Sequence, residues 1–108
     1  MIQPEEAEVA AWLGARSERM IETACARVFL AGEVAYKVKR RVSLGYLDYS
    51  THDLRHWALD RELSFNRAAA PDIYRSVRRL TRSPDGGIEF DGQGELVDWL
   101  LEMRRFDE

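Results

Sequence analysis

The sequence predicts a single α+β domain, with an antiparallel sheet, one long packed helix and a second helix at the N-terminus. Two observations support this fold class. Several segments alternate apolar and polar residues and are joined by glycine-containing turns, as antiparallel strands are. Between these segments, residues 51–68 carry apolar side chains at helical spacing. We expect about five strands, and a chain of 108 residues fits one domain.

The first helix is predicted over residues 4–17. Pro4 suits the first helical position, and the acidic residues after it favour the positive end of a helix. Val9, Trp12 and Leu13 form one apolar stripe. We therefore assign residues 1–18 to an N-terminal helix and residues 20–106 to the rest of the domain.

The first two strands are expected at residues 27–31 and 34–40, with a tight turn at Gly32-Glu33. Residues 20–23 can add a strand before them. Side chains alternate between the two faces of a strand, which separates them into two sets. Val34, Tyr36 and Val38 share one face, and Ala35, Lys37 and Lys39 share the other.

The long helix is predicted to begin after Ser50, which forms a capping box with Asp53 in place of the usual Glu. It ends before Pro71, because the residue preceding proline avoids the helical conformation. The side chains at helical spacing are Leu54, Trp57, Ala58, Arg61, Glu62 and Phe65. An acid such as Glu62 on the packed side is costly unless it is paired. The sequence leaves two options open, a pair with Lys37 or a surface pair with Arg55 or Arg61.

Three further strands are predicted at residues 73–82, 88–90 and 95–104. The turn Ser83-Pro84-Asp85-Gly86-Gly87 joins the first two of them. The last segment is ambiguous, because Leu96 and Leu100 also fit helical spacing. We expect a strand there, since alternate positions are apolar: Val97, Trp99, Leu101 and Met103.

Composition favours a cytoplasmic protein. The net charge is −3, there is one cysteine, and no apolar run is long enough to span a membrane. We expect neither nucleic-acid nor membrane binding. Several basic residues could form a patch, but we interpret them as a solvated strand face: Lys39, Arg40, Arg41, Arg75, Arg78, Arg79 and Arg82.

His52 and His56 have the spacing of metal ligands, but the sequence offers no third ligand, so no metal site is expected.

Lysine is the most selectively placed residue type. Fourteen of the sixteen basic residues are arginine, and both lysines lie in Val34-Ala35-Tyr36-Lys37-Val38-Lys39. Lysine is a compact point charge, whereas arginine is a planar fork, so the two are not interchangeable. Val34 to Lys37 also matches the strand signature Val-Ala-Ile-Lys of protein kinases, whose lysine pairs with nucleotide phosphates. The alternative is an exposed lysine on a strand.

The segment from Val28 to Phe106 resembles the N-terminal lobe of the aminoglycoside phosphotransferase-like kinases, in particular that of bacterial bifunctional aminoglycoside phosphotransferase/ATP-binding proteins. The matching segments are Val28-Phe29-Leu30-Ala31-Gly32, Ala35-Tyr36-Lys37-Val38-Lys39-Arg40, Leu44-Gly45-Tyr46-Leu47-Asp48, Ser50-Thr51, Glu62-Leu63, Asn66-Arg67, Ala70-Pro71-Asp72-Ile73-Tyr74 and Met103-Arg104-Arg105-Phe106. The resemblance implies that the fold is a kinase-like N-lobe and that the protein is an ATP-dependent phosphotransferase. Such an enzyme transfers the γ-phosphate of ATP to a hydroxyl of a small molecule.

The resemblance also implies roles for individual residues. Lys37 and Glu62 are the predicted catalytic residues, Lys37 on the nucleotide phosphates and Glu62 holding it. Ala35, beside Lys37, would let the base pack close. A hinge would bind adenine through backbone groups of Met103, Arg104, Arg105 and Phe106. The phosphate-covering loop departs from the family pattern, since Ala24-Cys25-Ala26 replaces a His-Ile-Ser-like segment, and Thr23 to Ala26 are the candidates for its role.

In that family the catalytic base and the Mg²⁺ ligands come from a C-terminal lobe. We therefore expect these residues to be one lobe, either cut at the hinge or encoded alone, and inactive by itself. ATP and Mg²⁺ are the expected cofactors of the parent enzyme. The alternative is a stand-alone interaction or regulatory module without catalysis, including a homo-oligomer formed through the exposed lobe interface.

Overall fold

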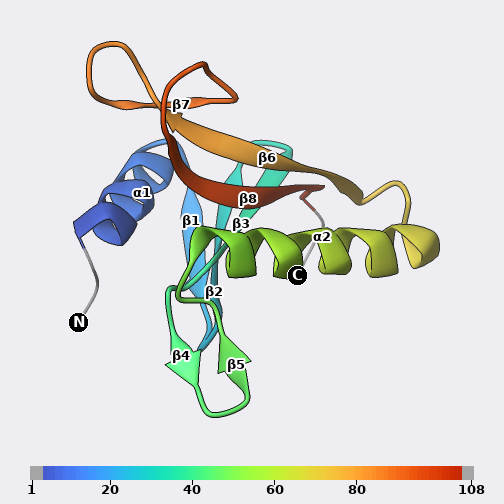
Figure 1. Ribbon diagram of the computed structural model, residues 1–108. Helices are drawn as coiled ribbons and strands as arrows, with labels where there is room; N and C mark the ends of the chain where they lie inside the picture. The colour runs from blue at the N-terminus through green and yellow to red at the C-terminus, as the bar shows by residue number, and fades with distance from the viewer. Residues whose placement is uncertain (1–3, 106–108) are drawn as a thin grey trace.

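The computed structural model describes residues 4–105, which form a six-stranded antiparallel sheet with a helix on each face (Figure 1). In chain order the elements are α1 (Pro4–Ala15), β1 (Arg19–Glu22), β2 (Ala26–Ala31), β3 (Val34–Lys39), β4 (Ser43–Leu44), β5 (Leu47–Asp48), α2 (His52–Ala69), β6 (Tyr74–Arg82), β7 (Ile88–Phe90) and β8 (Leu96–Arg104). The strand order of the sheet is β1-β2-β3-β8-β6-β7, and β4 and β5 form a separate hairpin. Within the described residues, no helix has the length and apolar character needed to cross a membrane.

The predicted α+β class with an antiparallel sheet is confirmed, but the expected strand number was too low. The sheet has six strands because residues 19–22 pair with β2, with Ile21 opposite Val28. The segment 95–104 is a strand, as predicted. It lies between β3 and β6 in the sheet, and α1 packs on one face of the sheet and α2 on the other, so its leucines need not alternate with polar residues. The two-residue strands β4 and β5 were not predicted.

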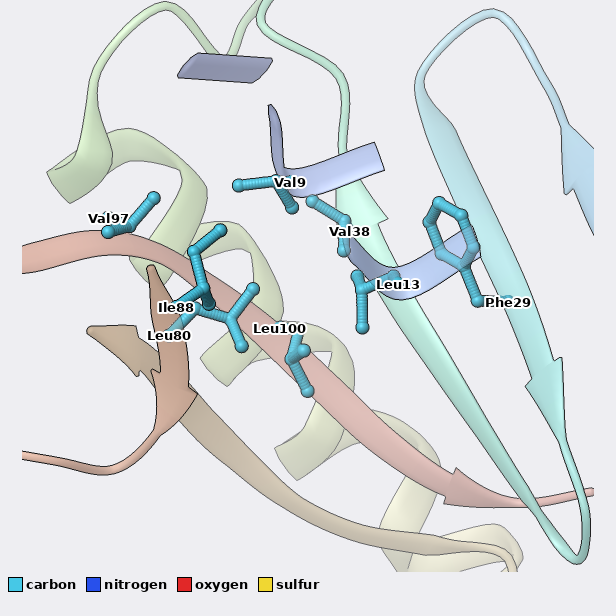
Figure 2. Packing of buried hydrophobic residues seen from close by; sticks show 8 residues of the cluster. All are labelled: Val9, Leu13, Phe29, Val38, Leu80, Ile88, Val97 and Leu100. Carbon is cyan, nitrogen blue, oxygen red and sulfur yellow. The ribbon is translucent and has the colours of Figure 1, made fainter. Parts of the chain in front are cut away.

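One core cluster lies between α1 and the sheet. Figure 2 shows Val9 and Leu13 of α1 among side chains contributed by five strands. The strand residues of this cluster are Phe29, Val38, Leu80, Ile88, Val97 and Leu100. The stripe predicted for the N-terminal helix is therefore its packed face, with Trp12 at the margin against Phe90.

A second core cluster lies between α2 and the opposite face of the sheet. Leu59 of α2 is fully buried there, together with Leu30, Ala35, Leu101 and Met103. Neighbouring residues such as Leu100 and Leu101 enter different clusters, as strand alternation requires. In Figure 1, α2 runs along β8 and β6. This arrangement brings the helix over the face that carries Lys37 and Lys39.

The start of α2 differs from the predicted capping box. Thr51 is the N-cap residue, and its side chain accepts a hydrogen bond of 3.1 Å from the backbone N–H of Leu54. Ser50 is engaged elsewhere, because its hydroxyl and its N–H both donate to Asp48. The carboxylate of Asp48 holds Ser50 in the turn before the helix, which leaves the next hydroxyl to cap it.

The packed side of α2 is also rotated from the predicted one. Trp57 and Phe65 are exposed, at 60% and 82%, whereas Arg55 and Leu59 are the buried residues. The prediction placed Trp57 and Phe65 on the packed side because they are apolar and lie at helical spacing. The helix instead faces the sheet with a side chain, Arg55, whose charge finds a buried partner on β8.

Candidate functional site

The candidate site joins β3 to α2 through one carboxylate and two ammonium groups. Lys37 Nζ lies 2.8 Å from Glu62 Oε2, and Lys39 Nζ lies 3.2 Å from Glu62 Oε1. Both lysines project from the same face of β3 because they are two residues apart on a strand. We call these three residues the lysine–glutamate cluster. The predicted pair of Lys37 and Glu62 is present in the structure, and the surface pair of Glu62 with an arginine is not.

The two arginines considered as partners of Glu62 are engaged elsewhere. Arg55 Nε donates to Asp98 Oδ1 at 3.0 Å, and both side chains are 1% exposed. The guanidinium of Arg61 lies over the ring of Trp57, 4.8 Å from its centroid, on the outer side of α2. Glu62 is thus the acid that faces the lysines of β3.

The cluster is partly buried, and burial and charge act in opposite directions on Glu62. The exposed fractions of the side chains are 26% for Lys37, 17% for Glu62 and 9% for Lys39. Burial alone would raise the pKa of Glu62, but the hydrogen bonds and charges of Lys37 and Lys39 outweigh it, so the pKa is lowered. Glu62 is therefore a carboxylate at neutral pH, and the cluster carries a surplus positive charge.

Tyr49 and the β1–β2 turn border the cluster. The ammonium of Lys39 lies 5.2 Å from the centroid of the Tyr49 ring. Burial raises the pKa of the Tyr49 hydroxyl, and the negative charge of Glu62 adds to this effect. Lys39 is paired with Ala26 across the sheet, which brings the turn 23–26 to the same end of β3. The residues predicted to cover phosphates thus lie near the cluster.

The β1–β2 turn is held by its own hydrogen bonds. The hydroxyl of Thr23 accepts from the N–H groups of Cys25 and Ala26, at 3.3 and 3.1 Å. Arg40 Nη1 donates to the carbonyl of Thr23 at 3.0 Å. This short turn therefore has a defined shape without the glycines of a kinase phosphate loop.

The residues predicted to contact adenine are less accessible than expected. Ala35 is 2% exposed and Met103 is 5% exposed, because both pack in the core cluster beneath α2. They are also register partners across β3 and β8. In this arrangement Ala35 offers almost no surface to a base.

The predicted hinge donors are also engaged. The N–H of Arg104 donates to the carbonyl of Ile73, and the N–H of Arg105 donates to that of Glu33, both at 2.7 Å. β8 continues through Arg104, so sheet pairing extends into the segment predicted to be a hinge. These two N–H groups are not available to adenine in this structure. Phe106, the last predicted hinge residue, lies outside the described residues.

The other candidate motifs are engaged in contacts within the chain. Four arginines of the predicted basic face pair with acids: Arg41 with Glu5 and Asp98, Arg75 with Glu102, Arg78 with Asp91 and Glu102, and Arg82 with Glu8. The prediction of a solvated strand face was wrong for Lys39 and Arg41, whose side chains are only 9% and 7% exposed. His56 stacks on Trp99 with ring centroids 3.7 Å apart, and His52 lies 3.5 Å from Glu5. Within residues 4–105 no group of three or more His, Cys, Asp or Glu side chains is placed to hold a metal ion.

The sequence interpretation missed the contact of Lys39 with Glu62. It had a usable signal, since Lys39 is the second of only two lysines and shares the face of Lys37. It also missed Asp98, which stands within the apolar run Val97 to Leu101 of β8. An acid in such a strand is itself a signal that a buried cation must pair with it.

No protein-family model, curated protein or solved structure matches this chain. A kinase-like lobe is therefore a proposal, and it rests on the residues quoted above and on the geometry of the lysine–glutamate cluster.

Proposed function

We propose that this chain is the nucleotide-binding lobe of a kinase-like phosphotransferase that transfers the γ-phosphate of ATP to a hydroxyl of a small molecule. One observation carries the proposal: the ion pair of 2.8 Å between Lys37 on a central strand and Glu62 on the helix that follows. Phosphoryl transfer depends mainly on positioning and on neutralising phosphate charge. A lysine whose ammonium is oriented by a carboxylate and whose side chain is still 26% exposed is suited to that task.

The lysine–glutamate cluster is suited to bind phosphates, whereas the described residues predicted to contact adenine are not available in this structure. Its surplus positive charge suits an anion, whereas Ala35 and the N–H groups of Arg104 and Arg105 are engaged in the sheet and its core. In this proposal the ligands of Mg²⁺ and the catalytic base belong to a second lobe, where the metal would supply further neutralisation of the phosphate charge. The contribution of this chain is to hold the phosphates through Lys37.

The test is calorimetric titration of the chain with MgATP and with inorganic tripolyphosphate. We expect Lys37→Ala to abolish binding of both, with an unchanged circular dichroism spectrum, because Lys37 is on the sheet surface and not in either core. Arg61→Ala is the matched control, since it removes a positive charge from the outer side of α2. Equal binding by Lys37→Ala and the unaltered chain would exclude the phosphate role. In a two-lobed parent enzyme, Lys37→Ala should abolish turnover, and Glu62→Gln should lower it less.

A second candidate function is a protein-interaction or regulatory module without catalysis. The observation that favours it is the outer side of α2, where Trp57 and Phe65 are largely exposed around Arg61. Large exposed aromatic side chains on one helix face are typical of contact surfaces. Size-exclusion chromatography with light scattering would test self-association. A monomer at all concentrations that is unaffected by Phe65→Ser would count against a homo-oligomer.

A further inference from the structure

Glu62 has a different lysine on each of its oxygens, and the two lysines differ in accessibility. Lys37 holds Oε2 and keeps 26% of its side chain exposed. Lys39 holds Oε1 and is 9% exposed, with its ammonium in cation–π range of the Tyr49 ring. Lys39 thus contacts Glu62 from the interior, whereas Lys37 contacts it from the side that a ligand can reach.

This division matters when an anion binds. An anion that approaches Lys37 competes with Glu62 for the same ammonium, and the two negative charges repel each other. With Lys37 as its sole partner, Glu62 would be free to turn away as the anion arrived. Lys39 opposes that movement because it retains Oε1 and supplies a second positive charge.

We propose that Lys39 is a positioning residue, which keeps Glu62 ionised and in place while Lys37, the more exposed of the two lysines, turns its ammonium toward an anionic group of the ligand. The identification of that group as a phosphate of ATP rests on the proposed function. The bracing of Glu62 by Lys39 is a property of this chain alone, and the two claims can fail separately.

The first experiment tests, without any ligand, whether Lys39 keeps Glu62 ionised. The pKa of the Glu62 carboxyl is measured by NMR titration in the unaltered chain and in Lys39→Met. We expect the pKa in the variant to be higher, because a neighbouring positive charge has been removed. Lys39→Arg should keep the low value, and Arg61→Met is the charge-matched control on the outer side of α2. Should Lys39→Met fail to fold, Lys39→Gln tests the same rise. An unchanged pKa would overturn the brace.

The second experiment tests whether Lys39 acts through Glu62. Affinity for inorganic tripolyphosphate is measured by calorimetry in Lys39→Met, Glu62→Gln and the double variant. We expect Lys39→Met to weaken binding about tenfold alone, but by less than about threefold when Glu62 is already Gln, as for residues coupled in one network. Lys39→Arg should restore most of the affinity. A tenfold loss that persists in the Glu62→Gln background would make Lys39 a direct anion ligand and overturn the positioning role.

The outcomes separate the two proposals. If the unaltered chain binds neither tripolyphosphate nor MgATP while Lys39→Met still raises the pKa of Glu62, the proposed function fails and the brace is supported. If the chain binds both ligands and Lys39→Met changes neither the affinity nor the pKa, the positioning role is wrong and the proposed function is unaffected.

Discussion

Two ionic contacts join α2 to the sheet, and they differ in burial and in charge balance. The first is the arginine–aspartate contact, Arg55 with Asp98, in which both side chains are 1% exposed. Arg41 approaches the same carboxylate at 3.4 Å and also pairs with Glu5 at 2.9 Å. Two cations thus meet two acids. Backbone groups also bind both side chains, since Arg55 Nη1 donates to the carbonyl of Tyr49 and Asp98 accepts from the N–H of Trp99.

The second contact, the lysine–glutamate cluster, is open on one side and unbalanced. Two cations meet one acid, and the side chain of Lys37 remains 26% exposed. Both contacts lie on the sheet-facing side of the same helix, two turns apart. The comparison indicates that the balanced, closed contact fixes α2 on the sheet, whereas the surplus charge of the open contact is left for a ligand. Charge balance and exposure distinguish the two contacts. Distance does not, since the shortest nitrogen–oxygen distances are 3.0 Å for Arg55 with Asp98 and 2.8 Å for Lys37 with Glu62.

The largest effect is expected from breaking the closed contact. Arg55→Met leaves the longer contact to Arg41 as the remaining ion pair of the buried Asp98 carboxylate, and loss of one partner of a buried ion pair costs about 3–5 kcal/mol. We expect the free energy of unfolding, from urea denaturation, to fall by that amount.

The control for this variant is Arg61→Met on the exposed side of α2. Its cation–π contact with Trp57 should contribute about 1 kcal/mol or less. If Arg55→Met and Arg61→Met lowered stability equally, the arginine–aspartate contact would not be the anchor of the helix. The double change Arg55→Met with Asp98→Leu should recover most of the loss, since apolar pairs often replace buried ion pairs without cost.

A smaller effect is expected from Glu62→Gln. The side chains of the lysine–glutamate cluster are 9–26% exposed. Water can therefore partly solvate the charges of both lysines when the carboxylate of Glu62 is removed. Hydrogen bonds to charged groups contribute about 1.5–3 kcal/mol, and partial solvation should reduce the loss to about 1–2 kcal/mol. Urea denaturation of this variant beside Arg55→Met measures the difference directly. A loss as large as that of Arg55→Met would mean that the lysine–glutamate cluster is also a structural anchor.

The sequence predicted more of the sheet than of the helix orientation. Strand alternation and glycine turns are local signals, and they placed β2, β3, β6, β7 and β8 within a few residues. Alternation also put Lys37 and Lys39 on one face, which the structure confirms. The rotation of α2 depends on Asp98, forty-three residues away from Arg55, and no local pattern reports a contact at that separation.

The candidate site was predictable in its charges but not in its accessibility. A costly acid on a packed helix and a selectively retained lysine made the pair of Lys37 with Glu62 one of two options, and the kinase resemblance favoured that pair. The engagement of Ala35, Arg104 and Arg105 did not follow, because it depends on how far β8 continues beside β3 and β6. Pairing with neighbouring strands decides where a strand ends, and the alternation of apolar and polar residues does not show how far that pairing extends.

The smallest expected effect is a pH dependence that belongs to Glu62. Its pKa is lowered in the folded chain from an ordinary value of 4.5, since Lys37 and Lys39 outweigh the effect of burial. A carboxyl with a lowered folded-state pKa binds protons more weakly when folded, so it stabilises the fold above its ordinary pKa. That stabilisation is lost as pH falls below 4.5 toward the lowered value.

The measurement is the difference in unfolding free energy between the unaltered chain and Glu62→Gln, followed from pH 7 downward. Other carboxylates with lowered pKa values, such as Glu8 and Asp91, are present in both proteins and cancel in the difference. We expect a constant difference at neutral pH that shrinks below about pH 4.5, as the Glu62 carboxylate takes up a proton. A difference that stayed constant to low pH would show that the lysines do not stabilise the charged form of Glu62, and the open contact would lose its electrostatic basis.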